Sequence, residues 1–350
     1  MGELKIEEGI TTRKVGGRDV VASYGNDEGA REAYKSGAML VDRSHWGLIR
    51  LAGSTRHAFL HNQTTADFNR ARAGESVEAV VLTSTARIVD WVRALVTEDA
   101  MWLVTSPERR EILLNWFPRF IFFNDDVRIV DESDNYAIFS LLGPESGTLL
   151  RDLGASDVMG LEPGHHTLVT LADVEGVRVA VGGGLLGEGY TLIVPVEGAE
   201  ALWSALRAAG AEPAGEDVWE ALRVEQGRPA ADRELTEDHN PLEAGLWEAV
   251  SFTKGCYIGQ EIVARLDTYQ KLKQQLWGLR LSDLVQPGAP VLVEGSEVGH
   301  VTSVAKTPEG PFALAYIRTK AGGEGLEVQV DGVKGTVVDL PMVTRGRRDI

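Results

Sequence analysis

The chain is organised around Phe252-Thr253-Lys254-Gly255-Cys256-Tyr257-Ile258-Gly259-Gln260-Glu261-Ile262-Val263-Ala264-Arg265, which carries the only cysteine of the 350 residues between two glycines. Glycine adopts backbone conformations that other residues avoid, so residues 254–259 are predicted to form a tight loop. The spacing that follows predicts a helix over residues 260–266. A thiol near the free N–H groups of a helix N-terminus, with Lys254 close by, is typical of a reactive cysteine. The alternative is that Cys256 is a small buried apolar residue, as most free cysteines are.

The residues from Lys254 to Glu261, Lys-Gly-Cys-Tyr-Ile-Gly-Gln-Glu, closely resemble the signature of the YgfZ group. Proteins of this group bind folate and support the assembly or repair of iron-sulfur proteins. They are similar in fold to the T-protein (aminomethyltransferase) of the glycine cleavage system. A second, independent resemblance covers Leu40 to Asp67, where His61-Asn62-Gln63-Thr64-Thr65-Ala66-Asp67 is similar to the opening of T-protein-like chains.

The composition is that of an ordinary globular protein, with 43% hydrophobic and 25% charged residues. Its 350 residues are enough for two or three packed domains. Asp and Glu outnumber Lys and Arg by 52 to 35, which gives a net charge of −17. Such a surface repels phosphate groups, so we expect neither general nucleic-acid binding nor binding to anionic membranes.

The first residues, Met1-Gly2-Glu3-Leu4-Lys5-Ile6-Glu7-Glu8, are acidic where a signal peptide needs a basic segment and then an apolar run. No apolar run approaches the roughly 18 residues of a membrane-spanning helix. A single cysteine excludes an internal disulfide, and we expect a cytoplasmic protein. One cysteine also cannot supply the full set of thiolates that usually holds an iron-sulfur cluster, so any cluster would be shared or would belong to a client protein.

Alternating apolar residues, helical spacing and turn residues predict the secondary structure. Strands are predicted over residues 38–41, 47–51, 77–83, 88–97, 101–106, 127–130, 136–142, 168–172, 177–181 and 190–196, and helices over residues 28–35, 54–62, 107–117, 144–153, 199–209 and 216–226. After residue 275, short runs separated by glycine and proline predict a small barrel, over residues 276–281, 290–293, 298–304, 312–317, 326–330 and 335–338. In residues 1–36, which are polar, only the one helix is predicted.

This order of elements predicts an α+β fold with antiparallel sheets and helices on one face. The resemblance to the T-protein family covers most of the chain. It implies a three-lobed arrangement around a central folate pocket, with two interleaved antiparallel-sheet α+β lobes and a C-terminal β-barrel. We therefore expect a T-protein-like folate-binding region over residues 1–275 and a barrel over residues 276–350.

Glu225 lies in Ala221-Leu222-Arg223-Val224-Glu225-Gln226-Gly227, at the end of a predicted helix. In T-protein-like chains the glutamate of the comparable Arg-x-Glu-x-Gly pattern holds the pterin ring, so the resemblance implies this role for Glu225. A carboxylate has two acceptor oxygens, and a pterin edge presents two parallel N–H donors. The alternative is a solvated glutamate at a helix end.

Asp90 and Trp91 stand where T-proteins carry a pair of acidic residues that serves catalysis. The resemblance implies a catalytic role for Asp90, but the second acid is a tryptophan here, which argues against aminomethyl transfer. Trp91 is expected either to stack on a bound ring or to lie in the core, which is the commoner fate of tryptophan.

Two other patterns are less specific. Gly182, Gly184 and Gly187 satisfy G-x-G-x-x-G, but a strand is predicted after them where a dinucleotide site needs a helix, so we expect a hairpin connection. His57 and His61 have the spacing of two ligands on one helical face, but no third ligand is evident, and we expect no metal site.

Lys254, Arg228 and Arg265 are expected to form a basic pocket for the glutamate tail of a folate or for an anionic group of a client, with a solvated surface as the alternative. The catalytic residues that we predict are Cys256, Lys254 and Asp90, and the predicted folate contacts are Glu225, Trp91, Arg228, Tyr257 and Arg265. The expected ligand is tetrahydrofolate or another reduced folate, and the expected partners are iron-sulfur client proteins or assembly factors.

Three functions remain open on the sequence. The favoured one is a folate-binding protein that supports iron-sulfur proteins through Cys256, which would bind a cluster intermediate, exchange electrons with a client or accept a one-carbon unit. The second is a folate-dependent aminomethyltransferase. The third is an adaptor that only docks clients, with Cys256 as a packing residue.

Overall fold

The computed structural model describes residues 9–347, so the expectations about Met1–Glu8 lie outside the described residues. The chain forms two compact units. The first comprises Met1–Arg56, Ala71–Val77 and Arg93–Trp219, and the second comprises His57–Arg70, Glu78–Val92 and Glu220–Ile350. Because the chain passes between them several times, the units are interleaved in sequence.

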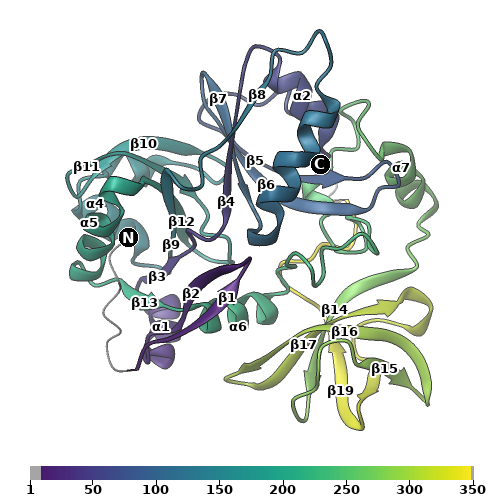
Figure 1. Ribbon diagram of the computed structural model, residues 1–350. Coiled ribbons are helices and arrows are strands. Elements are labelled where there is room, and N and C mark those ends of the chain that lie inside the picture. Colours follow the sequence, from purple (N-terminus) through teal and green to yellow (C-terminus); the bar gives the residue numbers. More distant parts are fainter. Residues whose placement is uncertain (1–8, 348–350) are drawn as a thin grey trace. The chain divides into compact units, whose positions relative to one another are not determined.

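The first unit contains a six-stranded sheet in the order β10-β11-β12-β9-β3-β13 (Figure 1). Its strands are β3 (Met39–Asp42), β9 (Tyr136–Leu142), β10 (His166–Leu171), β11 (Val174–Val181), β12 (Gly189–Pro195) and β13 (Glu212–Ala214). All neighbours are antiparallel except β13 and β3. The helices of this unit are α1 (Asp27–Ser36), α3 (Arg110–Trp116), α4 (Ser146–Asp152) and α5 (Val196–Ala208), with the short 3-10 helices η1 (Pro107–Arg109), η2 (Phe117–Phe120) and η3 (Ser156–Gly160).

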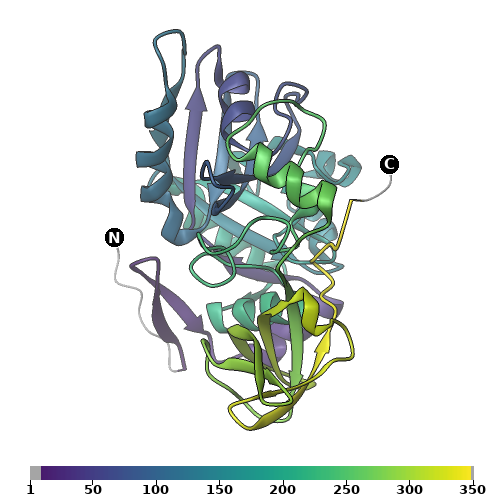
Figure 2. The ribbon, with the colours of Figure 1, turned by 90° about the vertical axis from the view of Figure 1, so that its right-hand side faces the viewer.

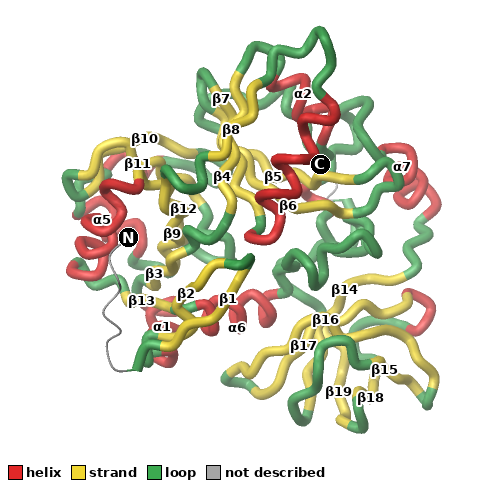
Figure 3. Tube along the Cα trace, viewed as in Figure 1, coloured by secondary structure: helices red, strands yellow, loops and turns green. Residues whose placement is uncertain are grey.

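The two faces of this sheet bury different partners. Phe139 and Leu192 pack with Leu150 of α4 and Leu202 of α5 in one apolar cluster. The neighbouring residues Ile138 and Ile193 point to the opposite face, as the two-residue period of a strand requires, and join a second cluster with Leu48, Leu95 and Val104. Figure 3 distinguishes the strands, in yellow, from the helices, in red.

A second sheet has the order β5-β6-β7-β4-β8. Its strands are β4 (Gly47–Ala52), β5 (Ser76–Leu82), β6 (Ile88–Val96), β7 (Ala100–Thr105) and β8 (Arg128–Asp131). Strands β5 and β6 run through both units, since residues 78–92 belong to the second and their flanks to the first.

The sequence prediction missed one hairpin of the first unit. Strands β1 (Thr11–Val15) and β2 (Arg18–Ser23) pair in the polar segment where the sequence predicts only one helix. Gly16 and Gly17, with φ of 55° and 77°, make the turn between them. A two-residue Gly-Gly connection with positive φ at both positions is a hairpin signal, so the sequence did contain the information. Arg13 holds the hairpin to the start of α6 (Glu216–Gln226), with Nη1 2.9 Å from Asp217 Oδ1.

The second unit combines α2 (Arg56–Gln63), most of α6, η4 (Trp247–Ala249) and α7 (Gln260–Tyr269) with a barrel. The barrel is closed and has the order β14-β17-β16-β15-β18-β19, and its strands are drawn in green to yellow in Figure 2. They are β14 (Gln274–Leu281), β15 (Pro290–Val293), β16 (Ser296–Thr307), β17 (Gly310–Arg318), β18 (Glu327–Val330) and β19 (Val333–Val338), with η5 (Thr319–Ala321) after β17. The predicted mixed α+β architecture with a C-terminal β-barrel is confirmed.

The G-x-G-x-x-G glycines connect β11 to the antiparallel β12, and the Gly182 N–H donates to the Gly189 carbonyl at 2.7 Å. The predicted strand after the glycines is therefore present. Among residues 9–347, no helix combines the length and the apolar character needed to cross a bilayer. The expected division at residue 275 stays a prediction.

Candidate functional site

The two segments that stood out in the sequence meet within the second unit. The Thr65 hydroxyl donates to the carbonyl oxygen of Ala249 at 2.6 Å. Farther along the chain, the Ile258 N–H donates to the carbonyl oxygen of Asn62 at 3.1 Å. The segment of residues 61–66 therefore supports the loop that carries Cys256.

Lys254 makes the closest connection between these segments. Its Nζ donates to the carbonyl oxygens of His61, Thr64 and Ala66, the last two at 2.6 Å. These acceptors lie at and beyond the C-terminal end of α2, where the helix dipole favours a cation. Burial lowers the pKa of Lys254 to about 7, and the negative charge of Asp67 opposes this decrease. An ammonium has three N–H donors, and these three carbonyl oxygens accept all of them.

The residues beside Lys254 have opposite environments. Tyr257 is buried and packs in an apolar cluster, with the centre of its ring 4.8 Å from Lys254 Nζ. Burial raises the pKa of the Tyr257 phenol. Cys256 is exposed, so the alternative of a small buried residue is wrong. Helix α7 begins at Gln260 as predicted, which leaves Cys256 in the loop ahead of the first helical turn.

Arg265 is an exposed residue of α7. Its Nη2 lies 3.4 Å from Oε1 of Glu261, one turn earlier. Solvent screens such a pair, so it holds the side chain only weakly. Arg265 thus contacts its own helix, whereas Lys254 contacts the segment of residues 61–66, and the expected basic pocket with Arg228 stays a prediction.

Asp90 and Trp91 lie in β6 in different surroundings. Asp90 is fully buried. Trp91 is half-buried and packs against the same apolar cluster that contains Tyr257. The guanidinium carbon of Arg228 lies 4.4 Å from the centre of the Trp91 ring, which is a cation–π contact. The indole Nε1 of Trp91 is buried and has no hydrogen-bond partner within residues 9–347.

Glu225 is half-buried near the end of α6. Three residues later the chain has left the helix and reaches Arg228. In the part of the chain that the structure describes, Glu225 has no hydrogen bond or ion pair, whereas its neighbour Arg223 is fully engaged. The second unit thus offers a carboxylate, Glu225, three residues before a cation, Arg228, that lies over the aromatic face of Trp91.

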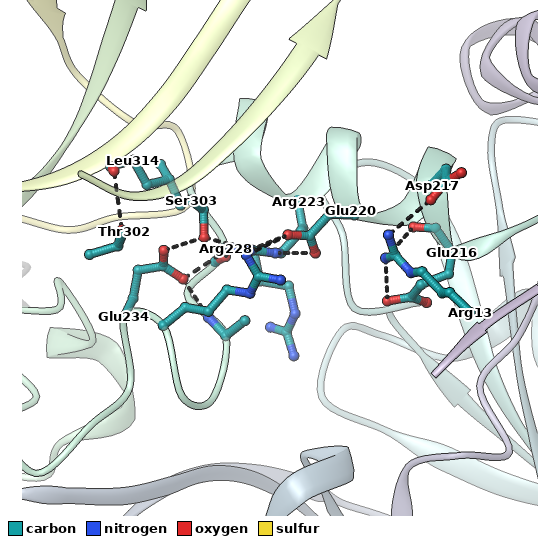
Figure 4. Close-up of polar contacts among 12 residues, drawn as sticks. Arg13, Glu216, Asp217, Glu220, Arg223, Arg228, Glu234, Thr302, Ser303 and Leu314 are labelled. Carbon is teal, nitrogen blue, oxygen red and sulfur yellow. Dashed lines mark hydrogen bonds and ion pairs between the residues drawn. The ribbon is translucent and has the colours of Figure 1, made fainter. Parts of the chain in front are cut away.

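The sequence prediction missed a buried group beside this region. Arg223, Glu234 and Ser303 form a polar network, shown in Figure 4, and each is at most 2% exposed. Arg223 stood in the quoted Arg-x-Glu pattern, but nothing in the sequence pairs it with residues 11 and 80 positions away.

No group of three or more His, Cys, Asp or Glu within residues 9–347 is arranged to hold a metal ion. His57 Nδ1 lies 2.9 Å from the Phe68 carbonyl oxygen, and His61 Nδ1 lies 3.2 Å from Asp67 Oδ1. His57 therefore has a main-chain partner, whereas His61 only lies within ion-pair distance of Asp67.

Two family models match the chain. The GCVT N-terminal domain matches residues 8–254, and the glycine cleavage T-protein C-terminal barrel domain matches residues 274–344. The chain belongs to the glycine cleavage T-protein family.

Relatives within and near the T-protein family cover almost the whole chain. A protein of Arabidopsis thaliana named "putative transferase, chloroplastic" is 40% identical over 96% of this chain and 78% of its own length. The aminomethyltransferase of Rubrobacter xylanophilus is 31% identical over 95% of this chain and 90% of its own length. The structure of aminomethyltransferase T from Bartonella henselae superposes with a TM-score of 0.86 at 21% identity, covering 97% of this chain and 96% of that one, and so confirms the fold. The predicted cytoplasmic location stays a prediction, since the Arabidopsis relative is chloroplastic.

Proposed function

We propose that this T-protein family member binds a reduced folate, tetrahydrofolate or a close derivative, and supports iron-sulfur proteins through Cys256. Folate binding, the first part of this proposal, is supported mainly by Glu225. This residue is a half-buried carboxylate that has no hydrogen bond or ion pair within residues 9–347. Three residues later in the chain, the guanidinium of Arg228 lies over the ring of Trp91. Membership of the T-protein family, with relatives named aminomethyltransferases, supports a folate ligand.

The available groups fit the chemistry of a reduced folate. A pterin ring presents parallel N–H donors, which the two oxygens of Glu225 accept in pairs. The ring also has a flat face suited to the Trp91 indole, and the guanidinium of Arg228 suits an anionic or electron-rich part of the ligand. When bound, a reduced folate carries one-carbon units on its ring nitrogens.

The iron-sulfur half of the proposal rests on the loop from Lys254 to Glu261, with its resemblance to the YgfZ signature. The only thiol of the chain is exposed there, on a loop that Lys254 holds in place. An exposed thiol on a fixed loop is accessible to an iron-sulfur client protein or assembly factor.

The folate half is tested by calorimetry with tetrahydrofolate and 5-formyltetrahydrofolate. Wild type should bind at least one of them, and Glu225→Gln should weaken binding about tenfold or more, because one acceptor oxygen of the carboxylate becomes a donor. Glu237→Gln changes an exposed glutamate of the same unit and should leave affinity unchanged. If wild type binds neither folate, the folate half is lost.

The iron-sulfur half is tested in cells that lack this protein. Wild type should restore the activity of iron-sulfur enzymes, and Cys256→Ala at matched expression should not. Equal rescue by both proteins would leave the thiol without a role and favour a docking adaptor.

A folate-dependent aminomethyltransferase is the second candidate, and the relatives that carry this name favour it. Asp90 would then handle charge at the reacting nitrogen, although it is fully buried. This candidate requires turnover with an aminomethyl donor and its loss in Asp90→Asn, with Cys256→Ala fully active. Absence of turnover would remove it.

A further inference from the structure

The side chain of Arg223 has every donor satisfied inside the second unit (Figure 4). Its Nε and Nη2 donate to the two carboxylate oxygens of Glu220, at 2.7 and 2.5 Å. The remaining donors reach Glu234 Oε2 at 3.0 Å, Ser303 Oγ at 2.7 Å and the Arg228 carbonyl at 3.2 Å. A guanidinium has five N–H groups in a fixed fork, so this pattern fixes its position completely.

Glu234 and Ser303 connect the guanidinium of Arg223 to the barrel. The Ser303 hydroxyl, on β16, accepts from Arg223 and donates to Glu234 Oε1 at 2.6 Å. The Ala230 N–H donates to Glu234 Oε2 at 3.0 Å, and the Tyr316 hydroxyl of β17 donates to the Glu234 carbonyl at 2.8 Å. Glu234 and Ser303 are both 0% exposed. Because these polar groups are buried away from water, losing any one hydrogen-bond partner would cost free energy. The network therefore favours a single arrangement of hydrogen bonds.

The network acts on Arg228 through the main chain. The Arg228 N–H donates to the Arg223 carbonyl at 2.8 Å, and the Arg228 carbonyl accepts from the Arg223 guanidinium. Both backbone groups of Arg228 are therefore held by one residue, while its side chain lies over Trp91. A shift of Arg223 would move the residue that covers the Trp91 ring.

We propose that Arg223, Glu234 and Ser303 are positioning residues of the ligand site. They fix the chain between Glu225 and Arg228 against the barrel, so that Ser303 of the barrel strand β16 contributes to the affinity of the site. The inference rests on the proposed folate binding, because it assigns these residues to that ligand.

Adjacent hydroxyls of β16 give a matched test. Ser303→Ala removes the barrel hydroxyl that contacts both Arg223 and the Glu234 carboxylate, and leaves the Tyr316 contact in place. Thr302→Val removes the hydroxyl of the next residue, which is also buried but donates to the Leu314 carbonyl at 3.1 Å. Binding of 5-formyltetrahydrofolate is measured by calorimetry. Separately, the Trp91 signal is followed without ligand by fluorine NMR of protein labelled with 5-fluorotryptophan, and Trp91→Phe assigns it.

Ser303→Ala removes two charge-assisted hydrogen bonds, to Arg223 and to Glu234. It should weaken folate binding about five- to tenfold, which is part of their combined contribution, and shift the Trp91 resonance. Thr302→Val should do neither. Should Ser303→Ala not fold, Glu234→Gln tests the same link. Unchanged affinity in a folded Ser303→Ala overturns the inference, as does equal weakening by Thr302→Val. If wild type binds no folate, the proposed function fails, whereas an unshifted Trp91 resonance refutes the positioning role itself.

Discussion

The Nζ atom of Lys254 lies 2.6 Å from the carbonyl oxygen of Thr64. This contact joins the two segments that are most distinctive in the sequence, although 190 positions separate them. It makes Lys254 a support of the loop around Cys256 and gives this lysine a structural role.

Lys254→Met should destabilise the protein by roughly 3 kcal/mol, because three carbonyl oxygens lose their hydrogen-bond donor in a half-buried place. The measurement is the free energy of unfolding from urea titrations. Lys271→Met, which changes an exposed lysine near Tyr269, should stay within about 0.5 kcal/mol of wild type. Equal stabilities of the two variants would show that the carbonyl contacts contribute nothing.

Cys256 should react with a thiol reagent in the folded protein, because its side chain is exposed. A disulfide reagent should label one thiol per chain under native conditions, and Cys256→Ala should abolish the signal while changing the free energy of unfolding by less than about 0.5 kcal/mol. Labelling that requires denaturant would contradict the exposed position of the thiol.

Regular elements were predictable where local signals were strong. The barrel followed from short apolar runs between glycines and prolines, and α7 from its polar first turn. The hairpin of β1 and β2 was missed because its strands are mostly exposed and polar, so no apolar alternation marks them. The only local signal for this hairpin is the Gly16-Gly17 pair at its turn.

The site was predictable as a set of residues but not as a set of contacts. The motifs identified Glu225, Trp91 and Lys254, yet the partner of Lys254 is a row of backbone carbonyls, which carry no sequence signal. Glu234 and Ser303 were missed for a similar reason, since only the fold brings a loop residue and a barrel strand to Arg223.

Acid should destabilise the second unit through His239. This residue is 3% exposed, its ring centre lies 3.6 Å from that of Tyr316, and its Nδ1 lies 3.0 Å from Gln274 Nε2. Burial, assisted by the charge of His300, lowers the pKa of His239 to about 4, from 6.5 in the unfolded chain. Between these values the unfolded state binds the extra proton, so the stabilisation is complete above about pH 6.5 and is lost as the pH falls through about 4.

The test compares unfolding free energies of wild type and His239→Phe between pH 8 and pH 4. The variant keeps an aromatic ring on Tyr316 but cannot be protonated, so wild type should lose on the order of 3 kcal/mol more than the variant over this range. The buried His45 and His166 are present in both proteins and cancel in the difference. Parallel curves would show that His239 is not held neutral.

Gly259 should be the less replaceable of the two glycines that flank Cys256. Both have positive φ, 102° at Gly255 and 84° at Gly259, so a side chain costs about 1 kcal/mol of backbone strain at either position. Their surroundings differ. A Cβ at Gly259 would lie 2.9 Å from the Thr83 carbonyl oxygen and 3.0 Å from the Ala86 Cα, whereas a Cβ at Gly255 would have no atom within 4 Å. Gly259→Ala must therefore displace backbone at the N-cap of α7.

We expect Gly259→Ala to lower the free energy of unfolding by about 1 to 3 kcal/mol more than Gly255→Ala does, because overpacking adds to the same backbone strain. Urea unfolding of the two variants measures this difference directly. The rate at which Cys256 reacts with a thiol reagent reports on the loop itself. It should change in Gly259→Ala, where the helix start moves, and much less in Gly255→Ala. Equal destabilisation by the two substitutions would mean that the backbone at Thr83 and Ala86 can move to accommodate a Cβ at Gly259. The tight packing of Gly259 against these residues would then not be what holds the Cys256 loop in place.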